Sequence, residues 1–370
     1  MKRSLRSGAL LLISLLLFSC ATSVGIGYTS PSEIDMGHYR NIGVASTVPF
    51  EGFLKPNGYI ATMDDASTLR FGFVFSNYNY LLKDQVASYA TQRLVGTLEN
   101  TGYFNVTRPK KVDAILNVAG YQDARSMFKK ANIDAVIIPK IDSMAVNEYI
   151  YSKNVEKIVK DATGKETKKV ETSYYYSAQV SMVYSYVIID TDTERIVARK
   201  SFPLRSDEYV VEISSPHFSY SIQNAFSSLI DSIQYDIVSQ LVPREKVIYE
   251  TLMDNKPKVA ELERAYRDVD DGMYTSALQM FLLEWKGSLH LPSGYNSSLL
   301  LAALGRYDEA ILQIEDVIRH YPSSRESVYL RARLLEIRDC NRKGQGQVKG
   351  ENPKVFDSRN SNIYGAIMDN

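Results

Sequence analysis

The stretch AQVSMVYSYVIID, residues 178–190, alternates apolar and polar side chains over most of its length. A period of two is typical of a β-strand with one buried face and one solvated face. The following Asp-Thr-Asp-Thr, 190–193, favours a turn, and residues 195–202 predict an antiparallel partner strand. These residues therefore predict the centre of a β-sheet. The predicted buried face consists of Ala178, Val180, Met182, Tyr184, Tyr186 and Ile188.

Segments on both sides of this strand pair have the period of helices or further strands. The run 132–138 is apolar nearly throughout, as expected of a strand that is covered on both faces. We therefore predict an α/β domain, a mixed sheet flanked by helices, over residues 38–250. The other predicted elements are a strand at 39–47 and helices at 84–101, 112–130 and 215–243.

Residues 148–177 have tyrosines at both ends and a lysine-rich centre, a pattern that predicts a long β-hairpin. Six lysines and four acidic residues fall between Lys153 and Glu171. Strands of a transmembrane barrel need about 9–11 residues that alternate between apolar and polar. Charges along both arms therefore favour a hairpin that protrudes into solvent. A pore element or a membrane-touching arm is the alternative.

A repeated heptapeptide follows the α/β region. GMYTSAL at 272–278 recurs as GRYDEAI at 305–311, a shift of 33 residues. This period marks a helical repeat array, and the pattern resembles the tetratricopeptide repeat. We predict all-α tetratricopeptide-like repeats over residues 251–340. Such arrays generally need three or more repeats, so we expect this short array to pack on the first domain. The small residues of the first helices, expected near a concave partner-binding face, are Ala265, Ser298 and Ala332.

The N-terminus has the plan of an export signal. Three basic residues precede an apolar run at 8–18, which is shorter than the roughly 20 residues that a bilayer-spanning helix needs. The junction Leu-Phe-Ser-Cys, 17–20, resembles the bacterial lipobox. We therefore interpret residues 1–19 as a lipoprotein signal peptide and Cys20 as the site of lipid attachment. Because Ala21 follows Cys20, the resemblance implies the outer membrane.

Two segments lack a regular period. Residues 20–37 contain prominent Ser, Thr, Gly and Pro, and we predict a lipidated tether there. Residues 341–370 are rich in Asn, Gly, Ser, Lys and Gln, and we predict a disordered tail.

Four motifs of the α/β region occur in a familiar order. They are YRNIGVAS (39–46), LENTGYFNV (98–106), ANIDAVIIPKID (131–142) and YSYVIIDTDTERIVARKSF (184–202). Over about residues 38–243 the chain resembles the bacterial envelope lipoprotein family that includes the curli-secretion channel lipoprotein and the lipoprotein activators of penicillin-binding proteins. The resemblance implies an α/β fold held at the cell envelope.

Composition excludes some classes of partner. The 370 residues include 43 basic and 43 acidic side chains, so there is no electrostatic case for nucleic acid. The only cysteines, Cys20 and Cys340, are far apart in sequence, and no disulfide framework follows.

Candidate catalytic and metal-binding residues are scarce. Asp268–Gly272 is similar to a calcium loop, but its glycine comes one position early. Cys340 is interpreted as a structural thiol. His217 stands beside Ser214 and Ser215, and helix capping explains this run better than catalysis. The four histidines, none with metal-like or triad-like spacing, are His38, His217, His290 and His320. We expect no enzymatic activity, no cofactor and no metal site.

Together these patterns predict an outer-membrane-anchored lipoprotein that faces the periplasm, with exposure on the cell surface left open. We expect it to contact the membrane through the lipid on Cys20 and to bind another envelope protein or peptide as a non-enzymatic adaptor or scaffold. The alternative is an oligomeric secretion pore component of the curli type. A hydrolase is the third alternative.

Overall fold

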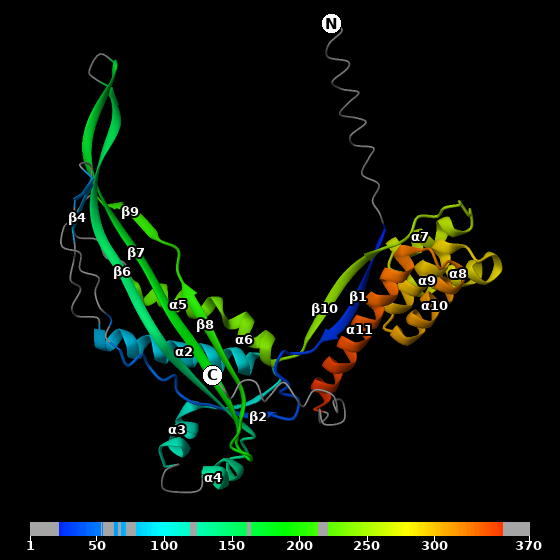
Figure 1. Ribbon diagram of the computed structural model, residues 1–370, viewed down its shortest axis with the longest axis horizontal. Helices are drawn as coiled ribbons and strands as arrows, with labels where there is room; N and C mark the ends of the chain where they lie inside the picture. Colours follow the sequence, from blue (N-terminus) through cyan, green and yellow to red (C-terminus); the bar gives the residue numbers. More distant parts are fainter. Residues whose placement is uncertain are drawn as a thin grey trace. The chain divides into compact units, whose positions relative to one another are not determined.

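The computed structural model describes residues 22–52, 54, 63–65, 68–71, 79–118, 124–160, 164–213 and 221–350 (Figure 1). The chain divides into two compact units. One unit is the continuous segment Glu33–Val242, called the α/β unit here. The other combines Met1–Ser32 with Pro243–Asn370 and is called the helical unit.

The α/β unit is built on two long strands, β6 (Ala135–Lys160) and β7 (Glu166–Asp190), which form one antiparallel hairpin. The other strands of this unit are shorter. They are β2 (Asn41–Val44), β3 (Met63–Asp65), β4 (Thr68–Phe71), β5 (Asn105–Thr107), β8 (Ile196–Arg205) and β9 (Tyr209–Ile213). The helices are α2 (Asn79–Asn100), α3 (Pro109–Val118), α4 (Ala124–Lys130), α5 (Ile222–Ser232) and α6 (Gln234–Leu241).

The hairpin strands carry the short strands on their outer edges. Strand β2 lies parallel to β6 and to β5, whereas β4 pairs antiparallel with β6 further along its length. On the other side, β8 and β9 pair antiparallel with successive parts of β7. The sheet is therefore mixed, as the sequence predicts, and the turn at 190–193 returns the chain into β8.

The predicted inner face of β7 is confirmed. All six of its alternating residues from Ala178 to Ile188 are at most 2% exposed, and they share one core with α2, α5 and α6. A smaller core on the opposite face joins Val136 to α3 and α4. The neighbouring Ile137 lies in the larger core. The start of β6 is thus covered on both faces, which explains its continuous apolar sequence.

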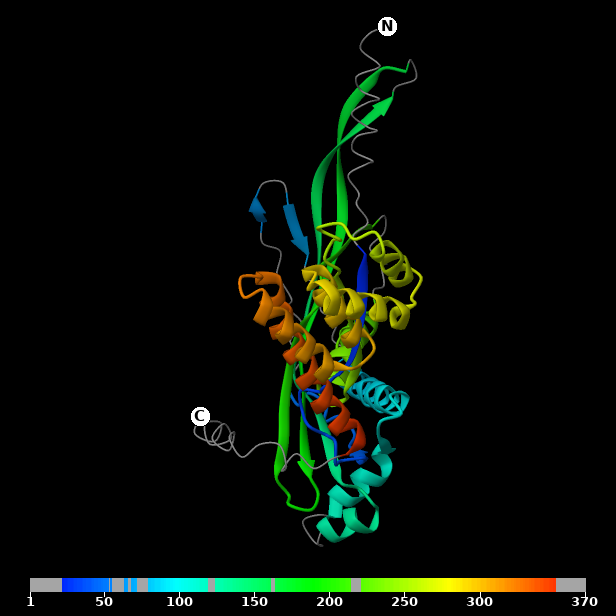
Figure 2. The ribbon, with the colours of Figure 1, turned by 90° about the vertical axis from the view of Figure 1, so that its right-hand side faces the viewer.

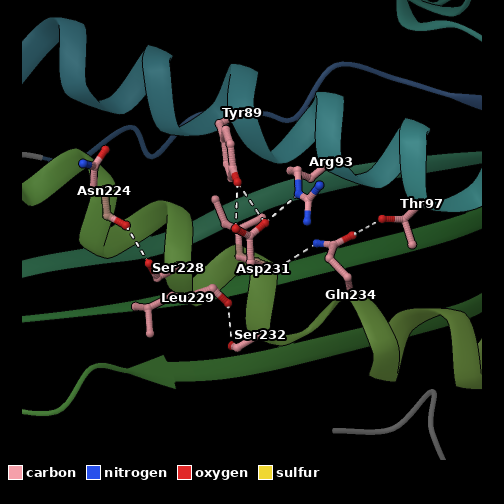
Figure 3. Close-up of polar contacts among 10 residues, drawn as sticks. Tyr89, Arg93, Thr97, Asn224, Ser228, Leu229, Asp231, Ser232 and Gln234 are labelled. Carbon is pink, nitrogen blue, oxygen red and sulfur yellow. Dashed lines mark hydrogen bonds and ion pairs between the residues drawn. The ribbon is translucent and has the colours of Figure 1, made fainter.

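Polar side chains tie α2 to α5 and α6 along one seam (Figure 3). The Asp231 carboxylate accepts hydrogen bonds from the Tyr89 hydroxyl at 2.8 Å and from Arg93 Nε at 2.6 Å. Thr97 Oγ1 donates to Gln234 Oε1 at 2.9 Å. Burial and the bond to Asp231 raise the pKa of the Tyr89 hydroxyl. Because Asp231 and Arg93 are partly solvated, the seam fixes helix register more than it adds stability.

The helical unit contains a stack of consecutive helices that confirms the predicted all-α region. Its members are α7 (Leu262–Asp270), α8 (Tyr274–Ser288), α9 (Leu291–Ala303), α10 (Tyr307–His320) and α11 (Arg325–Lys349). Gly272 and Gly305 occupy equivalent turns with φ of +76° and +77°, a conformation that favours glycine. Ala277 and Ala310, one turn later in each motif, are fully buried. The 33-residue repeat is therefore visible in the packing of the helices.

The structure differs from the predicted tether at 20–37. Strand β1 (Ser23–Ser30) pairs antiparallel with β10 (Arg244–Thr251) over eight residues, and the two form a separate two-stranded ribbon. The boundary predicted at residue 250 differs too, because β10 belongs to the helical unit.

The structure also differs from the tail predicted at 341–370. Helix α11 continues to Lys349 and ends at Gly350, whose φ is +73°. Residues 351–370 lie outside the described residues.

Candidate functional site

Two of the three small residues predicted near a concave partner-binding face pack between helices. Ala265 and Ser298 are fully buried, and Ser298 Oγ donates to the carbonyl oxygen of Gly294 at 3.1 Å. Ala332 is exposed on α11. Ala265 and Ser298 therefore pack between helices, and other side chains would have to make any partner contact near them.

The ribbon packs on the stack and covers its first helices. Val24, Ile26 and Leu252 belong to the same core as residues of α7, α9 and α11, and β1 contacts both α9 and α11. Every residue of α9 from Pro292 to Ala302 is buried. The chain itself therefore occupies the surface of α9 that a bound peptide would need.

One asparagine fixes the chain just after β10. Asn296, fully buried on α9, accepts from the Met253 N–H at 2.8 Å and donates to the Met253 carbonyl oxygen at 3.0 Å. Its amide also donates to the Tyr266 hydroxyl at 2.9 Å, which donates to the Met253 carbonyl at 2.6 Å. Burial of this network raises the pKa of Tyr266 to about 12. The sequence analysis missed Asn296, although an asparagine inside an apolar helix is a detectable signal.

Side chains of α10 and α11 satisfy the outer edge of β1. The Thr29 N–H donates to Asn341 Oδ1 at 2.9 Å, and the Tyr307 hydroxyl donates to the Gly27 carbonyl oxygen. The N–H of Ser32, just after the strand, donates to Gln347 Oε1 at 2.8 Å. These bonds leave β1 paired on one side and capped on the other, so the strand is an integral part of the helical unit.

The predicted lipid site therefore lies close to a rigid element. Cys20 is outside the described residues, and Ser23, the first residue of β1, is three positions later. Three residues span at most about 10 Å. A lipid on Cys20 would hold the helical unit close to the membrane, not at the end of a long tether.

The paired strands of the α/β unit extend beyond its core as a narrow arm, residues 154–160 and 166–173 (Figure 2). Ion pairs cross between its strands: Lys168 Nζ lies 2.9 Å from Glu156, and Lys160 Nζ lies 3.5 Å from Glu166. All these charged side chains are well exposed. The charges are therefore paired and solvated, as the sequence predicts for a protruding hairpin.

Three exposed apolar side chains, Ile158, Val159 and Val170, stand among these charges, and two of them share one face. Ile158 is 67% exposed and Val170 is 62% exposed. Ile158 lies opposite Lys168, and Glu156 lies opposite Val170, so the two apolar side chains are diagonal neighbours on one face of the arm. This pair, framed by ion pairs, is a candidate contact point for a partner.

A buried carboxyl group lies at the base of the arm. Glu148 is 8% exposed, and one of its oxygens accepts a hydrogen bond from the Tyr176 hydroxyl. Its other oxygen, Oε2, is buried without a hydrogen-bond partner. Burial raises the pKa of Glu148, and the bond from Tyr176 opposes the shift only in part.

The other end of the same sheet has a polar pocket of about 420 Å³, where β2 and β6 begin and β7 ends. The Tyr39 hydroxyl donates to Asp190 Oδ2 at 2.8 Å, and Asp190 Oδ1 accepts from the N–H groups of Asp192 and Thr193. Burial and the Asp190 carboxylate raise the pKa of Tyr39. These bonds hold the turn between β7 and β8, so the Asp190 carboxylate is used for structure.

The remaining candidate residues have structural surroundings. Both ring nitrogens of buried His290 are engaged, by Ser293 Oγ at 2.8 Å and the Pro257 carbonyl at 2.9 Å. His320 Nδ1 lies 2.9 Å from the carbonyl oxygen of its own helix at Asp316. His38 is exposed, with its ring against Tyr39. His217, with Ser214 and Ser215, lies outside the described residues.

Two further predictions concern the helical unit. Cys340 is a half-buried free thiol. In the loop at 268–272, Asp268 accepts a hydrogen bond from Ser276 Oγ at 2.6 Å and thereby joins α7 to α8.

Within the described residues, no group of three or more His, Cys, Asp or Glu could hold a metal ion. None of the helices in the described part of the chain is long and apolar enough to cross a membrane.

No known family model matches this sequence, and a search of curated proteins finds no match. Solved structures do show distant similarity. A neuraminyllactose-binding hemagglutinin homolog from Helicobacter pylori is 8% identical, over 64% of this chain and 95% of that chain, with a TM-score of 0.28. The PelC dodecamer from Paraburkholderia phytofirmans is 10% identical, over 59% of this chain and 96% of that chain, with a TM-score of 0.21.

We predict that Glu148→Gln stabilises the α/β unit at neutral pH. Burial raises the folded-state pKa of Glu148 above its unfolded value. The contribution of Glu148 to the free energy of unfolding is therefore most favourable below its unfolded-state pKa. This contribution is lost as the pH rises through the folded-state pKa. A neutral amide avoids the buried charge, so the thermal midpoint should rise at pH 7 and the difference should shrink at pH 4.

Glu156→Gln on the exposed arm is the matched control and should leave the midpoint nearly unchanged at both pH values. A lower midpoint for Glu148→Gln at pH 7 would show that the carboxylate has a stabilising partner.

Proposed function

We propose that the protein is a lipoprotein anchored through Cys20 to the outer membrane, facing the periplasm, and that it acts as a non-enzymatic adaptor for another envelope protein. The observation that carries the proposal is the position of β1. The strand starts three residues after Cys20 and is held by pairing with β10, by core contacts and by capping side chains. A lipid there would fix a folded unit near the membrane surface.

The arm of the α/β unit is the proposed partner-contacting part. It extends past the paired strands β4 and β9 and offers the apolar pair Ile158 and Val170. Apolar side chains between charged groups suit a protein surface of mixed character. The tetratricopeptide-like helices are assigned a scaffold role, because the ribbon covers their buried helix α9.

The exposed ion pairs of the arm weigh against the alternative of a pore element. A Lys or Arg side chain facing lipid near the bilayer centre costs about 2–4 kcal/mol. The arm has such charges on both of its strands. The engagement of His290 and Asp190 in structural bonds supports an adaptor over a hydrolase.

We predict that Cys20→Ser releases the protein from membranes. The lipid is the proposed source of attachment, since burial of each acyl CH₂ contributes about 0.8 kcal/mol. Membrane and soluble fractions would be compared after a high-salt wash. Cys340→Ser is the matched control and should remain membrane-bound. A Cys20→Ser protein that stays with the membrane would contradict the lipid anchor.

We also predict that a photoreactive residue at Ile158 cross-links one dominant envelope protein in intact cells. The same residue at Leu283 on α8, also strongly exposed at 75%, is the control and should not capture that protein. Equal capture at the two positions, or no capture at Ile158 in membrane-anchored protein, would contradict the assignment of the arm.

A further inference from the structure

The two edges of the β1–β10 ribbon differ. On the β1 edge, Asn341 caps the Thr29 N–H and Tyr307 caps the Gly27 carbonyl oxygen. In the described part of the chain, β10 pairs with β1 and with no other strand. An edge strand of eight residues with open main-chain groups is a template for pairing with another strand.

The hydrogen-bond pattern shows which groups of β10 point to the open edge. The Leu252 N–H donates to the Thr22 carbonyl at 3.0 Å, so Thr22 and Leu252 form a hydrogen-bonded pair. Such pairs alternate along an antiparallel ladder. The outward direction of the Thr29 N–H and the Gly27 carbonyl agrees with this alternation. The residues of β10 whose N–H and C=O groups face away from β1 are therefore Glu245, Val247, Tyr249 and Thr251.

We propose that the open edge of β10 pairs antiparallel with β10 of a second copy of this chain, centred on Ile248. The two ribbons would then form one four-stranded sheet with a two-fold axis at Ile248. Val247 and Tyr249 of each copy would form hydrogen-bonded pairs across the axis, Val247 facing Tyr249 of the partner subunit. This inference goes beyond the proposed adaptor function and does not depend on the lipid.

The sequence of β10 is complementary to itself in this register. Around Ile248, the segment Lys-Val-Ile-Tyr-Glu, 246–250, reads basic, apolar, apolar, apolar, acidic. Antiparallel pairing sets Lys246 against Glu250 of the partner subunit, twice by symmetry. Opposite charges and aromatic to β-branched pairs are the favourable combinations across strands. Charge and apolar character therefore match at every position of the segment.

Other registers lose this match. The N–H and C=O groups on the open edge of β10 belong to odd-numbered residues, so each hydrogen-bonded pair between the two copies must join two odd-numbered residues. The two-fold axis therefore passes through a residue and not between two residues. An axis at Val247 would place Lys246 opposite Ile248 of the partner subunit, and an axis at Tyr249 would place Glu250 there. Both leave a charged side chain facing an apolar one, so the axis at Ile248 is favoured.

The exposure of side chains on β10 also favours a second copy of this chain as its pairing partner. Val247 is 56% exposed and Tyr249 is 74% exposed, and both lie on the ribbon face opposite Val24 and Ile26. On the inner face, Glu250 lies 3.9 Å from Arg333 Nε of its own chain. Pairing would cover the two apolar residues and give Lys246 a carboxylate neighbour.

The register is tested by cross-linking of full-length protein in detergent that carries Cys20→Ser and Cys340→Ser. In the proposed dimer, residues 247 and 249 of opposite copies form hydrogen-bonded pairs with Cα atoms about 5.5 Å apart, within disulfide range. Val247→Cys with Tyr249→Cys should therefore give a covalent dimer on mild oxidation. Either substitution alone should not, because like positions are offset along the strands. Equal cross-linking by the single variants would overturn the register.

Light scattering of the same protein without added cysteines measures the association itself. We expect the mass of a dimer that dissociates on dilution. Lys246→Glu sets two pairs of carboxylates together and should weaken dimerisation about tenfold. Arg325→Glu makes an equal change of charge at an exposed position of α11 and should leave dimerisation unchanged. A monomer at all concentrations, or a dimer indifferent to Lys246→Glu, would overturn the proposal, as would a mixed complex with another protein's strand.

Discussion

The pairing of β1 with β10 is the constraint on which the rest of the chain depends. The two strands are joined by backbone hydrogen bonds, yet more than 200 residues separate them in sequence, and those residues form the α/β unit. The chain leaves the ribbon after Ser30 and returns at Arg244, and these two residues lie opposite each other in the ribbon. An inserted unit of this kind needs termini that lie close together, and the hydrogen bond from the Ile34 N–H to the Gln240 carbonyl shows that they do.

The same pairing explains how a short helical array is stable. A few repeats bury little apolar area compared with the backbone entropy lost, about 1–2 kcal/mol per residue. The ribbon adds Val24 and Ile26 to the core of the stack and encloses α9. The face that longer arrays leave open for ligands is here used for folding. We therefore propose that the exposed arm makes the partner contact and that a lipid on Cys20 provides the membrane attachment.

Sequence alone predicts the elements whose signals are local. The alternation of β7, the strand pairing of the charged hairpin and the all-α region after the sheet are each indicated by one segment, and all three are confirmed. That these helices are tetratricopeptide-like repeats stays a prediction. Strand β1 was missed because its glycines at 25 and 27 are typical of a flexible tether, and its partner is remote. The last turns of α11 were missed for a similar reason: Gly344 disfavours a helix, but a side chain there would collide with Thr29. Ala265 and Ser298 were correctly identified as small helix residues, but they lie in the core.

Amide hydrogen exchange of β1 tests most directly whether the N-terminal segment is part of the folded helical unit. The N–H groups of Val24, Ile26 and Tyr28 point toward β10 in the alternating ladder. They should exchange as slowly as the buried amides of α9, because the strand can open only when the stack opens. If these three amides exchange at the rate of an unstructured peptide while α9 stays protected, the account is contradicted. The result would then support the flexible tether that the sequence predicts at 20–37.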